Sequence, residues 1–237
     1  MGYIENPKTK GSGILCCIPQ EGECPNKCPD CFFQTGRSYL EPLSENLPNM
    51  PEIAQVGYRV VRVNDGNDSN VKIGQVLQMT FPYPLKFYNT ALPRNLVQFK
   101  APVVLTLNPG LGTDTKYHQL DEIPTNLMFV RARVNTWNLD LVDKIVDDYT
   151  SRNVAVVLTF MAYYSQTVKR PEDYEWKVRT LNSYWVLKDQ KREEIEDKYR
   201  HNSFVYSCGW RGTHACERCG TCLREFYATM ERMNEKE

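Results

Sequence analysis

Short apolar segments recur along the first two thirds of the chain, and polar or turn-forming residues separate them. Residues 14–18 form a continuous apolar run, which is the pattern of a strand buried on both faces. Apolar or alternating stretches predict five further strands, over residues 58–63, 86–90, 102–107, 127–134 and 154–161. We therefore expect six strands before position 162.

Two segments between these strands repeat apolar residues at helical spacing. Residues 71–80 and 139–149 each present one apolar face, and Asn138 can cap the start of the second helix. Continuous apolar strands that alternate with helices are typical of parallel strand–helix–strand units. The sequence thus predicts an α/β fold, and a polar stretch over 172–200 predicts further helix after the last of these strands.

Charge and hydropathy exclude several classes of protein. The 29 Lys and Arg residues balance 29 Asp and Glu residues, which disfavours a protein held to nucleic acid or anionic lipid mainly by bulk electrostatics. No stretch reaches the ~18 uninterrupted apolar residues of a membrane-spanning helix. Residues 1–13 are polar and lack the apolar core of a secretory signal. We expect a cytoplasmic protein that binds neither membranes nor nucleic acid.

Cysteine usage is unusual for such a chain. Nine cysteines without an export signal are not expected to form structural disulfides, because the cytosol keeps thiols reduced. They fall into two groups, and residues 32–207 contain none. The groups are Cys16, Cys17, Cys24, Cys28 and Cys31 near one end, and Cys208, Cys216, Cys219 and Cys222 near the other. Two such groups predict two metal sites.

The first site would be built by Cys24, Cys28 and Cys31, spaced C-x3-C-x2-C directly after the first predicted strand. Three soft thiolates so close in one loop can bind one metal site. A structural zinc site takes four ligands, usually as two separated pairs, and the three histidines (positions 118, 201 and 214) are distant in sequence. Three thiolates suit an iron–sulfur cubane that keeps one iron open, and a zinc loop is the alternative.

This motif, placed after the first strand of a parallel α/β chain, resembles that of the radical S-adenosylmethionine (SAM) enzymes. In that family three cysteines hold a [4Fe–4S] cluster, and its fourth iron binds the amino and carboxylate groups of SAM. Electron transfer then cleaves SAM to methionine and a 5′-deoxyadenosyl radical, which abstracts hydrogen from the substrate. The resemblance covers residues 12–165 and implies a partial (β/α)6 barrel with Cys24, Cys28 and Cys31 as cluster ligands.

The resemblance also points to residues that would contact SAM. The family binds the SAM amino group with a Gly-Gly-Glu-like turn after its second strand, and this chain has Asp65-Gly66-Asn67 there. Asp30 stands before the third cysteine, where the family often has an aromatic residue beside the adenine.

Polar residues on and after the predicted strands add candidates. Arg131 and Arg133 share one face of the fifth strand, and a strand paired on both sides should not bury two arginines without anionic partners. Arg133, near the carboxyl end, is a candidate clamp for the SAM carboxylate. Asn108 and Asn135 follow predicted strands at the edge where barrels keep their active sites, and they are equally suited to turns.

The second group supplies a complete set of four thiolates. Cys208-x7-Cys216-x2-Cys219-x2-Cys222 is closer to a ferredoxin arrangement than to a zinc ribbon, so we expect a second [4Fe–4S] cluster, with zinc as the alternative. With every iron bound by the protein, such a cluster would transfer electrons or stabilise the fold. It would belong to a small helical C-terminal extension over residues 166–237. Cys16 and Cys17, in the first strand, are expected to be buried free thiols.

These observations predict a radical SAM enzyme that acts on an unidentified small molecule or short peptide. An external electron donor such as flavodoxin or ferredoxin would reduce the cluster. The alternative is a non-catalytic binding module in which zinc or iron–sulfur clusters only stabilise the fold, and this alternative predicts no dependence on SAM.

Overall fold

The structure is a computed structural model of the 237-residue chain. It describes residues 2–22, 24–26, 28, 31, 48–108, 119–165, 167, 170–178, 183–209 and 216–235. Of the predicted site residues, Asp30 lies outside the described residues, as do His118 and His214.

Seven parallel strands form the main sheet, in the order β1-β2-β3-β4-β5-β6-β9, and the sheet curls through 181° into half of a barrel. Its strands are β1 (Ile14–Cys17), β2 (Val60–Val63), β3 (Lys86–Thr90), β4 (Val103–Leu107), β5 (Leu127–Val134), β6 (Val156–Phe160) and β9 (Val205–Ser207). The predicted α/β fold with a partial barrel is therefore confirmed, with six strands before position 162 as expected.

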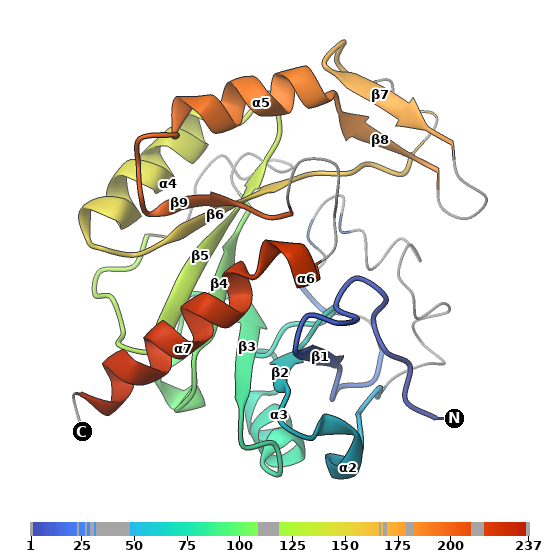
Figure 1. The fold of residues 1–237 in the computed structure, drawn as a ribbon, viewed down its shortest axis with the longest axis vertical. Coiled ribbons are helices and arrows are strands. Elements are labelled where there is room, and N and C mark those ends of the chain that lie inside the picture. The colour runs from blue at the N-terminus through green and yellow to red at the C-terminus, as the bar shows by residue number, and fades with distance from the viewer. Residues whose placement is uncertain are drawn as a thin grey trace.

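Helices connect or cover these strands (Figure 1). They are α2 (Ile53–Val56), α3 (Ile73–Thr80), the 3-10 helix η1 (Leu96–Phe99), α4 (Leu139–Ser151), α5 (Asp189–Lys198), α6 (Cys216–Cys219) and α7 (Thr221–Asn234). The two predicted helices correspond to α3 and α4. Asn138 is the N-cap residue of α4, but its side chain does not cap the helix. It accepts from the Asn135 backbone at 2.9 Å and donates to the Arg133 carbonyl at 2.9 Å instead.

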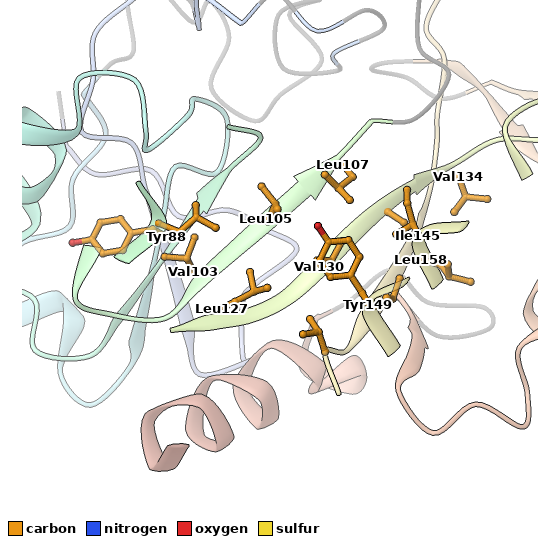
Figure 2. Close-up of a cluster of buried hydrophobic side chains, with 14 of the residues drawn as sticks. Tyr88, Val103, Leu105, Leu107, Leu127, Val130, Val134, Ile145, Tyr149 and Leu158 are labelled. Carbon is orange, nitrogen blue, oxygen red and sulfur yellow. The ribbon is translucent and has the colours of Figure 1, made fainter. Parts of the chain in front are cut away.

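One face of the sheet packs against α3 and α4. Alternate strand residues such as Leu105 and Val130 contact Ile145 and Tyr149 of α4 in a continuous buried cluster (Figure 2). All four side chains are almost completely buried. Because crossover helices lie outside a barrel, this is the outer face of the half-barrel.

The opposite, inner face is covered by α7, which crosses the sheet in Figure 1. Its apolar part includes Phe87, Val104 and Phe129, and Phe226 of α7 packs on them with its ring centroid 6.3 Å from that of Phe87. Phe226 is fully buried. The C-terminal segment thus completes the interior of the half-barrel.

The C-terminal half departs from the prediction in two places. The stretch 172–200 begins with an antiparallel hairpin of β7 (Tyr174–Lys177) and β8 (Tyr184–Leu187), and among its described residues α5 is the one helix. Trp176 and Trp185 form a cross-strand pair with ring centroids 5.4 Å apart, and such aromatic pairs stabilise hairpins. Second, β9 pairs with β6, so the segment after 166 adds a seventh strand to the sheet instead of being helical throughout.

None of the helices in the part of the chain that the structure describes has the length and apolar character needed to cross a bilayer.

The packing of α7 predicts a large effect of truncating Phe226. Phe226→Ala should lower the free energy of unfolding by about 3–5 kcal/mol, because a fully buried ring leaves a cavity on the inner face. Phe81→Ala is the matched control, since Phe81 is 82% exposed, and it should change stability by less than about 0.5 kcal/mol. Urea unfolding followed by circular dichroism measures both. Equal effects would contradict the packing of α7.

Candidate functional site

The first cysteine group lies in the loop after β1, at the carboxyl edge of the parallel strands. Cys24, Cys28 and Cys31 are free thiols of intermediate burial, and the Cys31 backbone donates to the Cys28 carbonyl at 3.2 Å. Burial, together with the nearby Asp68, Cys28 and Cys31, raises the pKa of Cys24 to about 11, although a hydrogen bond from the Asn26 backbone opposes the rise. The three thiols therefore share one neighbourhood.

A chain of hydrogen bonds joins this loop to β4 and β5. Asn108, just after β4, lies with its Nδ2 at 3.9 Å from Cys28 Sγ, and its Oδ1 accepts from Arg133 Nη1 at 2.9 Å. Arg133 Nε lies 2.7 Å from Met161 Sδ. Burial and Cys31 raise the pKa of the Cys28 thiol, while the positive charge of Arg133 opposes them. The structure thus brings together Cys28, Asn108 and Arg133, three residues that the sequence predicted for this site.

The buried carboxylate of Asp68 ties the same loop to β2 and β3. Its Oδ1 accepts from Thr90 Oγ1 at 2.7 Å and from the Asn70 backbone at 2.8 Å. Its Oδ2 accepts from the Ala91 backbone at 2.7 Å and from Asn26 Nδ2 at 2.8 Å. Asn26 lies between Cys24 and Cys28 in sequence. Asp68 is therefore an anchor of the cysteine loop.

Sequence reasoning missed Asp68, Asn26 and Gln20. Gln20 Nε2 donates to the carbonyls of Asp68 and Val71, at 2.8 Å each. The only signal was the Asn- and Asp-rich segment after β2, and that composition fits any turn. Nothing in the segment identifies which of its carboxylates is buried.

The predicted turn Asp65-Gly66-Asn67 follows β2, and the side chains of Asp65 and Asn67 contact different parts of the protein. Asn67 faces the cysteine loop, with its Nδ2 3.4 Å from the Gly22 carbonyl. The Asp65 carboxylate instead forms an ion pair with Arg62 and accepts from Asn6. Gly66, between them, is half-buried. Whether the three contact a cofactor stays a prediction.

Asn135 has a turn role. It is fully buried, its Oδ1 accepts from the Trp137 backbone at 3.1 Å, and its own backbone donates to Asn138. Its Nδ2 has no hydrogen-bond partner among the described residues. The buried amide thus keeps donor capacity that the described residues do not use.

The second cysteine group lies around the start of α7, where the segments before and after residues 210–215 meet. The backbone of Cys208 donates to the Leu158 carbonyl of β6 at 2.7 Å. Burial raises the pKa of Cys219, but hydrogen bonds with Thr221 and the Gly209 backbone, together with the charge of Arg224, outweigh burial and lower it overall. Gly209 has a φ of 84°, which favours glycine there. The four thiols are neighbours, since Cys208 also raises the pKa of Cys216 and Cys222.

The donor sets of the two groups fit iron–sulfur chemistry by ligand type and number. Both consist of neighbouring thiols, which are soft ligands, and Asn108 and Gly209 supply hydrogen-bond donors to sulfur. Across the described part of the chain, no three His, Cys, Asp or Glu side chains are arranged so that they could hold one metal ion. The ligands of a cubane bind different irons, so they need not converge on a single point.

The buried thiols of the first strand match their prediction. Cys16 and Cys17 are fully buried, and Thr9 Oγ1 lies 3.6 Å from Cys16 Sγ. Burial raises the pKa of the Cys17 thiol. Both therefore behave as small hydrophobic residues.

Comparisons with protein-family models, curated proteins and solved structures found no match to this chain.

The Asp68 anchor predicts a specific loss of stability. In Asp68→Asn, the amide keeps one acceptor oxygen, so two of the four donors lose their acceptor. We expect the free energy of unfolding to fall by about 1–3 kcal/mol and hydrogen exchange in residues 24–28 to rise. Asp121→Asn, at an exposed position, is the control and should change neither quantity. If the two variants behave alike, the carboxylate does not hold the loop.

Proposed function

We propose that the protein is a radical SAM enzyme. The observation that supports this best is the position of the Cys24-x3-Cys28-x2-Cys31 loop at the carboxyl edge of a parallel half-barrel, with Asn108 and Arg133 against Cys28. A loop at that edge can present an open iron to the inner space of the barrel. The carboxyl edge is also where barrels bind their substrates.

The chain's own residues would hold and orient the cofactors. Cys24, Cys28 and Cys31 would bind a [4Fe–4S] cluster with one open iron. Such a cluster, given one electron by a donor such as flavodoxin or ferredoxin, would supply the cleavage of SAM into methionine and a 5′-deoxyadenosyl radical. The radical would take one hydrogen atom from the substrate. Arg133 would pair with the SAM carboxylate, because its guanidinium already lies beside the cysteine loop. Asn108 would fix both Arg133 and Cys28.

The second cysteine group would hold a further [4Fe–4S] cluster or zinc. The substrate class we propose is a small molecule or a short peptide, since the chain has zero net charge. The protein would work in the cytoplasm.

Cleavage of SAM tests the proposal directly. After anaerobic reconstitution with iron and sulfide, the full chain with SAM and dithionite should form 5′-deoxyadenosine, which chromatography with mass detection measures. Cys28→Ser should reduce formation to the assay background, because it removes a cluster ligand. Arg133→Gln should lower it about 10–100-fold, as loss of a residue that orients a cofactor commonly does.

A second variant serves as the control for iron content. Replacing Cys208, Cys216, Cys219 and Cys222 together by alanine should lower iron per chain by about half and leave part of the SAM cleavage. A wild-type chain that binds only zinc and forms no 5′-deoxyadenosine would contradict the proposal and favour the metal-stabilised binding module. Unchanged iron in the fourfold variant would exclude a second cluster at these cysteines.

A further inference from the structure

Two arginines extend from the inner face of the half-barrel at positions that the first site does not use. Arg62 of β2 has the same strand parity as Val60, and Arg131 of β5 has the same parity as Phe129, and both of those apolar residues lie on the inner face. The Arg62 side chain is only 12% exposed. Charged groups at such positions are costly without anionic partners.

The described residues offer these two arginines few anionic partners. Arg62 pairs with Asp65, but its Nε is buried and has no hydrogen-bond partner among the described residues. Within the described part of the chain, Arg131 donates to the Asn89 amide oxygen at 3.4 Å, and its guanidinium lies 5.8 Å from the centroid of the Phe129 ring. No carboxylate within the described part of the chain forms an ion pair with Arg131. The inner face thus carries more positive than negative charge around Arg62 and Arg131.

The C-terminal cysteines are packed against the same part of the inner face. Cys222 and Phe226 lie one helical turn apart on α7, and both pack on the inner-face cluster that contains Phe87 and Phe129. The start of α6 is fixed by a 3.0 Å hydrogen bond from the Cys216 backbone to the Lys8 carbonyl.

Two glycines before β1 show how closely α6 and α7 approach the start of the first strand. A Cβ on Gly13 would lie 3.1 Å from Leu223 of α7, and one on Gly11 would lie 3.0 Å from Glu217 of α6. The two helices are therefore seated on the barrel.

Electrostatic effects on the thiols agree with this packing. Burial raises the pKa of Cys222 against the opposing charges of Arg131 and Arg62, and the net result is a pKa of about 11. Arg62 acts in the same direction on Cys216. Both arginines therefore lie close to the second cysteine group, whereas Arg133, two residues along β5, acts on Cys28 of the first group.

We propose that Arg62 and Arg131 are the counter-charges of the four-cysteine centre formed by Cys208, Cys216, Cys219 and Cys222, and that they raise its reduction potential. This inference rests on the proposed iron–sulfur content of that centre. A cluster bound by four thiolates is an anion and becomes more negative when it accepts an electron, so a nearby fixed positive charge favours the reduced form. The site would thus lie on the inner face of the half-barrel and not on a separate extension.

The same geometry makes β5 a shared support for both centres. Arg131 and Arg133 point to the same side and stand roughly 6.6 Å apart along the strand, at ~3.3 Å per residue. Arg131 serves the four-cysteine centre and Arg133 the three-cysteine loop. Variants of Arg131 and Arg133 can therefore be compared directly, because both arginines lie on the same face of one strand.

The test uses the full chain with Cys24, Cys28 and Cys31 replaced by alanine, so that only the four-cysteine centre binds iron. A potentiometric titration followed by electron paramagnetic resonance gives its reduction potential. In this background Arg131→Gln should lower the equilibrium constant for reduction about tenfold, which is about 59 mV for one electron. Arg131→Lys keeps the charge and should keep most of the potential. Arg133→Gln removes a charge that lies nearer the three-cysteine loop, so it should shift the potential of the four-cysteine centre less than Arg131→Gln does.

The possible results distinguish the charge pairing from the presence of the redox centre. No shift in Arg131→Gln, or the same shift in Arg133→Gln, would overturn the charge pairing. A background chain that binds no iron, or binds zinc in its place, would overturn the redox centre itself, whereas the SAM cleavage assay on the unmodified chain reports separately on the first site. Should Arg131→Gln fail to bind iron, restored binding in Arg131→Lys would support the role of charge, and failure of both would contradict it.

Discussion

Parallel pairing of the strands is the constraint on which both cysteine sites depend. Because β1 to β6 and β9 all run in one direction, their carboxyl ends meet at one edge, where Cys28, Asn67 and Asn108 follow β1, β2 and β4. The same pairing fixes strand parity, so alternate residues enter the inner face of the half-barrel. Strand pairing does not fix the loop that contains Cys24 and Cys28, and the Asp68 carboxylate holds this loop by a hydrogen bond from Asn26.

The inner face is divided between apolar packing and charge. Phe87, Phe129 and Phe226 form its apolar part beneath α7, while Arg62 and Arg131 stand where the C-terminal cysteines approach the sheet. An apolar surrounding strengthens any electrostatic interaction beside it, since the effective dielectric constant is lower than that of water. The covering helix is therefore also part of the environment of the cysteines.

Local patterns predicted the first six strands and the helices α3 and α4 well, because their apolar runs end at sharp polar or proline-containing boundaries. The bounds of β3 and β5 agree with the prediction at both ends. The hairpin of β7 and β8 and the pairing of β9 were missed, since distant partners determine both. The same limit applies to the sites: cysteine spacing is visible in sequence, whereas the contacts of Asp68 and of Arg131 arise between segments far apart in the chain.

The place of α7 in the chain has a consequence for maturation. Residues 221–234 follow all seven strands of the main sheet, so a nascent polypeptide can pair β1 to β6 before this helix is synthesised. During that interval the apolar inner surface is open to water. Docking of the helix then buries it, so strand pairing and the closure of the barrel interior form an ordered pair of steps.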